Sequence, residues 1–142
     1  MMALQDVTNL LRTQGYKVTP QRLAVYEVLS HTKAHPTADA IYTQLQPNYP
    51  TMSLATVYKT LDILSKVGLV QVLNVGEESF RYDANVSSHP HICCVHCGRV
   101  DDVPHADERG LSQVVEQETG YRVSSQQLYF YGICPMCQKN VH

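Results

Sequence analysis

The chain between residues 89 and 97 reads His89-Pro90-His91-Ile92-Cys93-Cys94-Val95-His96-Cys97. A His-x-His pair therefore stands directly before a Cys-x-x-Cys pair, and a second Cys-x-x-Cys pair occupies residues 134–137. Two such pairs in a short chain are typical of a tetrahedral zinc site with four thiolate ligands and no open position. The sequence thus predicts a structural Zn2+ ion held by Cys94, Cys97, Cys134 and Cys137.

Two other interpretations of these cysteines are open. Disulfide bonds would need an oxidising compartment, and the N-terminus lacks the basic flank and apolar stretch of a secretory signal. A thioredoxin-like redox motif is the other alternative, but the chain has two Cys-x-x-Cys pairs and no matching fold pattern. Both are therefore less favoured than zinc, and the fifth cysteine, Cys93, has no partner in the pattern.

The composition is that of a globular protein. Of the 142 residues, 44% are hydrophobic and 17% are charged, and the apolar runs are too short to span a bilayer, so we expect a soluble protein. The net charge of -2 does not by itself indicate nucleic-acid binding. Residues 1–75 hold six Lys/Arg against four Asp/Glu, which permits DNA binding by the first half.

The first half has helical periodicity with clear end signals. We expect helices from Leu4 to just before Gly15, from Pro20 onward with Thr19 as N-cap, over residues 38–45, and from Ser53 to Val67. Two β-like runs, 69–73 and 79–82, then form a hairpin. Such an arrangement is typical of a winged helix-turn-helix, and most proteins that have it bind DNA.

The pattern changes after residue 83. Residues 84–91 are predicted to be a hinge, and the β-rich segments 92–103 and 121–133 flank one short helix that ends before Gly120. The predicted fold class is α+β. It comprises an N-terminal winged-helix domain over residues 1–83, the hinge, and a small second domain over residues 92–142 that contains the four paired cysteines.

The helix from residue 53 to 67 is the candidate for DNA contact. Its apolar residues face a core, although Ile63 falls on the polar side of the helical wheel, and its polar face mixes hydrogen-bonding and cationic groups that suit phosphates and base edges. Lys17 and Arg22 could add phosphate contacts. The candidate DNA-binding residues are Lys17, Arg22, Ser53, Thr56, Tyr58 and Lys59, with Thr60 and Lys66 on the same polar set.

A second metal site is suggested by the histidines. In an extended segment His89 and His91 point to the same side and could bind one ion together. Further ligands could come from Asp83, from Asp101 or Asp102, and from His35, although a residue of these types, taken alone, is more often a solvated surface residue than a ligand. Such a shell of nitrogen and oxygen ligands suits Fe2+ or Mn2+, and zinc less selectively.

Several motifs in order along the chain resemble the ferric uptake regulator (Fur) family. They are residues 15–22, 35–39 and 53–61, the His-Pro-His triplet, and the paired Cys-x-x-Cys. The resemblance implies a cytoplasmic bacterial transcription factor that acts as a homodimer, with residues 92–142 as an α/β dimerisation and metal-binding domain. It also implies that metal bound at the domain junction favours DNA binding. It assigns structural zinc to the four cysteines, and the regulatory site to His35, Asp83, His89, His91 and Asp102.

Within the family, two aspartates at positions 83 and 102 resemble the peroxide-regulator (PerR) branch, whereas iron-responsive members typically have glutamates there. In that branch bound Fe2+ reacts with peroxide, a ligating histidine is oxidised, and repression is lost. His35 and His89 match the susceptible positions.

We therefore expect a metal-dependent, peroxide-sensing repressor that binds an AT-rich inverted-repeat operator. One alternative is an iron- or zinc-homeostasis regulator that uses the same site reversibly. A metalloenzyme is the alternative from another class, and it is disfavoured because no general base or nucleophile pair stands beside the histidines.

Overall fold

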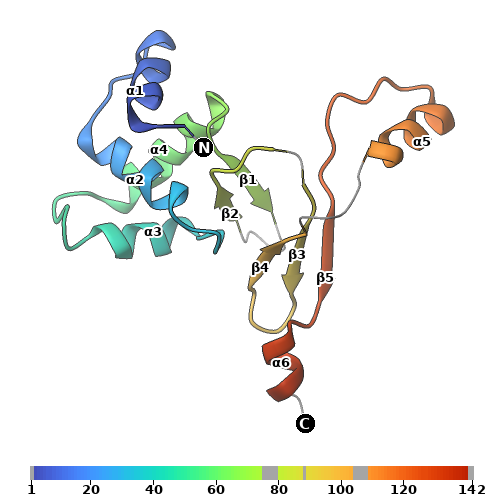
Figure 1. Ribbon diagram of the computed structural model, residues 1–142. Helices are drawn as coiled ribbons and strands as arrows, with labels where there is room; N and C mark the ends of the chain where they lie inside the picture. The colour runs from blue at the N-terminus through green and yellow to red at the C-terminus, as the bar shows by residue number, and fades with distance from the viewer. Residues whose placement is uncertain (1, 75–79, 88, 104–108, 141–142) are drawn as a thin grey trace. The chain divides into compact units, whose positions relative to one another are not determined.

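The computed structural model describes residues 2–74, 80–87, 89–103 and 109–140. The chain divides into two compact units, Met1–Val86 and Ser87–His142, which are described one at a time (Figure 1). The division falls inside the segment predicted as a hinge, and the exact domain limits remain a prediction. The tip of the predicted hairpin, residues 75–79, lies outside the described residues.

The first unit has the predicted order of four helices and a β-hairpin (Figure 1). The hairpin strands pair antiparallel, with Leu73 opposite Arg81. This is the winged helix-turn-helix arrangement. The elements are α1 (Leu4–Thr13), α2 (Pro20–Ser30), α3 (Ala38–Leu45), α4 (Leu54–Lys66), β1 (Gln71–Asn74) and β2 (Phe80–Asp83).

The helix ends follow the chemistry of their flanking residues. The Thr19 hydroxyl accepts the Arg22 N–H at 3.1 Å, and the Ser53 hydroxyl accepts the Thr56 N–H at 3.1 Å, so that α2 and α4 both begin at a hydrogen-bonded cap. Gly68, just beyond α4, has a φ of 82°, a left-handed conformation that glycine adopts without steric cost. The two caps confirm the expected starts of α2 and α4, and Gly68 confirms the expected end of α4.

Helix α4 is more deeply buried than its sequence pattern predicted. It packs against both α2 and α3, so its buried stripe is wide enough to include Ile63, which is only 4% exposed. The placement of Ile63 on the solvent side was therefore wrong. The opposite face is solvated as expected, since Asp62 and Lys66 form an exposed ion pair at 3.0 Å.

The second unit is a three-stranded sheet with two helices (Figure 1). Strand β3 (His91–Cys94) is central, pairing antiparallel with β4 (Val100–Asp102) and parallel with β5 (Tyr129–Gly132). Helices α5 (Arg109–Thr119) and α6 (Pro135–Asn140) complete it. Among the described residues, no helix combines the length and apolar character needed to span a membrane.

Two expectations for this unit need correction. Residues 121–128 were predicted to be β-rich, but the structure assigns no strand to them, and Tyr121 is 76% exposed. The apolar content there is not matched by a neighbouring strand in the described chain, so the extended pattern has no ladder to join. The short helix α6 was not predicted, because the second Cys-x-x-Cys pair was interpreted only as a metal-binding turn.

Candidate metal centres and nucleic-acid interface

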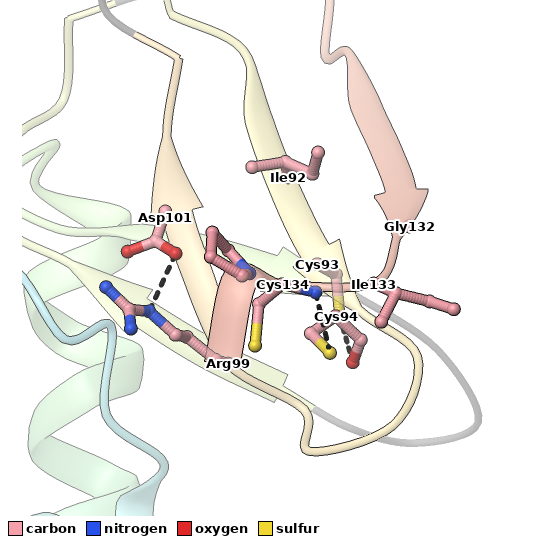
Figure 2. A pocket seen from close by; sticks show the side chains of 9 residues that line it. Ile92, Cys93, Cys94, Arg99, Asp101, Gly132, Ile133 and Cys134 are labelled. Atoms are coloured by element: carbon pink, nitrogen blue, oxygen red, sulfur yellow. Dashed lines mark hydrogen bonds and ion pairs between the residues drawn. The ribbon is translucent and has the colours of Figure 1, made fainter. Parts of the chain in front are cut away.

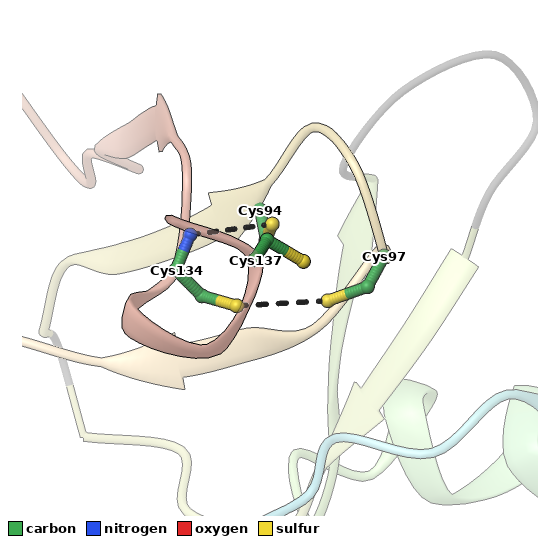
Figure 3. Close-up of side chains that lie close together, drawn as sticks. All are labelled: Cys94, Cys97, Cys134 and Cys137. Atoms are coloured by element: carbon green, nitrogen blue, oxygen red, sulfur yellow. Dashed lines mark hydrogen bonds between the residues drawn. The ribbon is translucent and has the colours of Figure 1, made fainter. Parts of the chain in front are cut away.

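The four paired cysteines converge in the second unit (Figure 3). Their sulfur atoms all lie within 4.8 Å of one another, and Sγ of Cys97 lies 3.8 Å from Sγ of Cys134. Four sulfurs at about 2.3 Å from a central zinc ion would be separated by about 3.8 Å in a regular tetrahedron. The donor set and its spacing therefore fit a structural zinc ion. Cys93 is buried and does not belong to this group.

The sheet explains why residues so distant in sequence meet here. The parallel pairing places Cys94 opposite Gly132, and the Val95 N–H donates to the Gly132 carbonyl at 2.9 Å. The chain leaving β5 thus reaches the end of β3 and continues into α6, which carries Cys137. On the other side, Gly98 has a φ of 78° and closes the turn that returns Cys97 toward the cluster.

Hydrogen bonds within the cluster shift the pKa values of the Cys94 and Cys137 thiols in opposite directions. The Cys134 N–H donates to Sγ of Cys94 at 3.3 Å, and this bond lowers the pKa of the Cys94 thiol to about 6. Hydrogen bonding with the Cys134 side chain raises the pKa of Cys137 to about 12. The cluster therefore favours a thiolate at Cys94 first, and a divalent cation would be needed to deprotonate all four thiols near neutral pH.

A small cavity of about 110 Å³ lies beside this cluster, lined in part by Cys93, Cys94 and Cys134 (Figure 2). Arg99 and Asp101 also line it, and they bond to each other, with the Arg99 Nε 2.8 Å from an Asp101 carboxylate oxygen. The ion pair is exposed, so it adds little stability. Asp101, one of the two carboxylates that the sequence offered as a ligand, is thus bonded to an arginine.

Asp102 is the carboxylate that lies within hydrogen-bond distance of His89 and His91. It stands opposite His91 in the β3–β4 register, and its Oδ1 lies 2.9 Å from Nε2 of His89 and 3.3 Å from Nε2 of His91. The centroids of the two imidazole rings are 4.4 Å apart, which agrees with the prediction that both side chains point to the same side. On the other edge of its ring, Nδ1 of His89 is 2.6 Å from the Ser87 carbonyl.

The remaining two candidate ligands form a buried pair in the first unit. His35 is 2% exposed and Asp83 is 8% exposed, and Nε2 of His35 lies 3.3 Å from Oδ2 of Asp83. The other carboxylate oxygen of Asp83 accepts the Asn85 N–H at 2.9 Å. Burial of two ionisable groups is costly unless they are paired or hold a metal. Each unit therefore contains one His–Asp group suited to a divalent cation with nitrogen and oxygen ligands.

The backbone of His35 is itself unusual. Its φ is 53°, and among the described residues it is the one non-glycine with a positive φ. A left-handed conformation costs an ordinary residue on the order of 1 kcal/mol, and such strain persists only where the surroundings enforce it. The Arg81 guanidinium donates to the His35 carbonyl at 3.2 Å. Sequence reasoning missed Arg81, although its position two residues before Asp83 on a strand was a usable signal.

The candidate DNA-binding residues lie mainly on α4 and at the start of α2. Tyr58 is 49% exposed and Lys59 is exposed, as a contact surface requires. Thr60 is 1% exposed and its hydroxyl bonds to the Thr56 carbonyl, so its inclusion in the polar set was wrong: it lies on the side of α4 that faces the core. Ser53 and Thr56 are bonded to each other at the N-terminus of α4.

At the start of α2, Lys17 is exposed and Arg22 is half-buried. The Arg22 guanidinium donates to the Lys17 carbonyl at 2.8 Å, so the structure brings these two candidates together. Their cationic groups and those of α4 all belong to the first unit.

A winged helix followed by a sheet unit with a four-cysteine cluster, with a His–Asp group in each unit, defines a DNA-binding protein of the metal-regulated class. The model of the ferric uptake regulator family matches residues 13–131, which is most of the chain. The protein belongs to that family.

Individual relatives cover almost the whole chain. The transcriptional regulator PerR of Clostridium acetobutylicum is 52% identical over 135 residues, which are 95% of this chain and 98% of that protein. The peroxide operon regulator of Bacillus subtilis is 39% identical and covers 96% of this chain and 94% of its own. The ferric uptake regulator of Helicobacter pylori, whose structure revealed three functional metal-binding sites, superimposes with a TM-score of 0.82 at 25% identity, covering 96% and 95% of the two chains.

Proposed function

We propose that this protein is a metal-dependent transcriptional repressor that senses peroxide in the cytoplasm. The observation that carries the proposal is the pairing of a histidine with an aspartate in each unit: His35 with Asp83, and His89 and His91 with Asp102. Two aspartates, rather than glutamates, distinguish the peroxide-sensing branch in the family resemblance, and the 52% and 39% identical relatives are named as regulators of that branch. The metal-homeostasis alternative is not favoured.

The two His–Asp groups are proposed to share one Fe2+ or Mn2+ ion. Three imidazole nitrogens and two carboxylates form a mixed shell that suits these ions better than a thiolate set would. The four-cysteine cluster is proposed to hold Zn2+ permanently, since a closed tetrahedral thiolate site leaves no position for a reacting ligand. The two metal sites therefore have separate tasks, one structural and one regulatory.

An ion shared by the two units would link metal binding to DNA binding. Residues from both units must adopt one relative pose to bind it together, and by linkage any DNA that selects the same pose raises the affinity for the metal. Loss of one metal ligand should then weaken both metal binding and DNA binding. Fe2+ held by these residues would cleave the O–O bond of peroxide by electron transfer. Overall, one oxygen atom of peroxide would be added to a ligating imidazole, which is the net two-electron reductant, and the other would leave as water. His35 and His89 are the proposed targets.

The operator is proposed to be an AT-rich inverted repeat that binds a homodimer. Two-fold symmetry in DNA matches two-fold symmetry in the protein, with α4 of each copy entering a half-site. The second unit offers the apolar surface that a dimer would cover. On α5 an exposed stripe consists of Leu111, Val114 and Val115, and Tyr121 follows.

The experiment that tests this function compares two metal forms of the same zinc-loaded protein. DNA duplexes are selected from a random-sequence library by the Mn2+ form, and binding is then measured with Mn2+ or Fe2+ before and after hydrogen peroxide. We expect both forms to bind, and only the Fe2+ form to release the DNA after peroxide. Failure to select any duplex, or equal release from both forms, would contradict the proposal.

Lys59 provides a separate test of the DNA-binding surface. Replacing it with alanine should remove one phosphate contact, which weakens binding similarly for all sequences and reduces the slope of log affinity against log salt concentration by about 1. The control is Lys33→Ala, which removes an exposed lysine of the same unit that lies outside α2 and α4 and should leave the slope unchanged. Fluorescence anisotropy over a range of salt concentrations measures both slopes. An unchanged slope for Lys59→Ala would place this side chain outside the interface.

A further inference from the structure

Strand β2 holds His35 at two points. Arg81 and Asp83 are two residues apart on the strand, so both side chains leave the same face. Oδ2 of Asp83 lies 3.3 Å from Nε2 of the His35 ring, and the Arg81 guanidinium donates to the His35 main-chain carbonyl at 3.2 Å. The ring and the backbone of one histidine are therefore held by neighbouring positions of the same strand.

The residue between them completes the attachment. The Tyr82 N–H donates to the Pro36 carbonyl at 3.1 Å. Three successive residues of β2 therefore bond to two successive residues of the loop between α2 and α3. His35 has the left-handed φ of 53° at this point. A non-glycine residue keeps such a conformation only where its surroundings determine it. The Arg81 bond acts directly on the peptide group that follows His35.

We propose that Arg81 is a positioning residue for the regulatory metal site: it fixes the His35 main chain so that the imidazole is aimed at the ion that Asp83 also binds. The inference rests on the proposed function. Arg81 stands opposite Leu73 in the hairpin, so any displacement of the wing moves Arg81 and Asp83 together. The orientation of a metal ligand is thereby coupled to the wing of the DNA-binding unit.

The direction in which metal affinity changes when Arg81 is replaced distinguishes a positioning role from a purely electrostatic one. A guanidinium cation repels a divalent cation, so an arginine that acted through its charge alone would weaken metal binding, and its removal would strengthen it. If Arg81 instead positions His35, its removal should weaken metal binding, because the imidazole must then be ordered when the metal binds and this ordering costs free energy. Loss of an outer-shell partner of a ligand typically lowers metal affinity by about 10–100-fold.

The test uses full-length, zinc-loaded protein and Mn2+ as the probe, with affinity measured by electron paramagnetic resonance titration. We expect Arg81→Met to bind Mn2+ about tenfold more weakly. Arg81→Lys, which keeps a cation and one donor, should recover part of this loss. Arg12→Met, which removes an exposed arginine from the last turn of α1, is the matched control and should bind as the unmodified protein does.

A double-mutant cycle with His35→Ala identifies the route of the effect. If Arg81 acts through His35, Arg81→Met should have no further effect on Mn2+ affinity once the imidazole is gone. Equal losses in the two backgrounds, unchanged affinity, or tighter binding by Arg81→Met would each overturn the inference while leaving the regulatory site intact. Absence of Mn2+ binding by the unmodified protein would instead overturn the proposed function, and this inference with it.

Discussion

Replacing Cys134 with serine is expected to release zinc and to unfold the second unit. The cluster joins the turn after β3 to the start of α6, and among the described residues the sheet between them has three strands. Zinc binding by four thiolates supplies on the order of 10 kcal/mol or more, which is comparable to the whole stability of a small domain. Loss of one ligand should therefore remove most of the stability of residues 87–142.

The measurement combines zinc content by atomic emission with thermal unfolding followed by circular dichroism. The matched control is Cys93→Ala, which removes the adjacent buried thiol that lies outside the cluster. This control should keep one zinc ion per chain. Stoichiometric zinc and unchanged unfolding of Cys134→Ser would refute the assignment of four thiolate ligands.

Replacing Asp102 with alanine is expected to abolish metal-dependent DNA binding while leaving zinc in place. One oxygen of this carboxylate lies close to Nε2 of both His89 and His91, so its removal deletes a proposed metal ligand and releases the two rings that it aligns. Because loss of an outer-shell partner alone costs about 10–100-fold in metal affinity, loss of a ligand should reduce Mn2+ affinity by more than about 100-fold.

The neighbouring aspartate supplies the control for this experiment. Asp101→Ala changes the same residue type one position earlier, where the carboxylate pairs with Arg99 instead of the histidines. Mn2+ titration and DNA binding should be nearly unaffected in Asp101→Ala. Similar losses in the two variants would mean that general negative charge, rather than the specific carboxylate of Asp102, attracts the metal.

The sequence was most informative where local chemistry determines structure. Thr19 and Ser53 predicted helix starts because a side-chain oxygen satisfies a free N–H, and the structure contains both bonds. The spacing of the Cys-x-x-Cys pairs predicted their cluster, since a tight turn brings each pair of sulfurs together. Alternation along a strand likewise predicted that His89 and His91 share a side.

Features that depend on tertiary neighbours could not be predicted in this way. Ile63 is buried because α4 packs against two helices, and a helical wheel does not include a second neighbour. Residue chemistry alone left the choice between Asp101 and Asp102 open and only the family resemblance selected Asp102, whereas the register of β3 with β4 places Asp102 opposite His91. The left-handed φ of His35 and its bond to Arg81 depend on a contact across 46 residues of sequence, which no local pattern encodes.

The central claim is that peroxide is sensed by oxidation of a metal ligand. Mass spectrometry of proteolytic peptides from the Fe2+-loaded, zinc-containing protein after one equivalent of hydrogen peroxide tests it most directly, with the Mn2+-loaded protein as the control. We expect a single added oxygen atom on His35 or His89 in the Fe2+ form and none in the Mn2+ form. Oxidation confined to the cysteines, with both histidines unmodified, would contradict the claim.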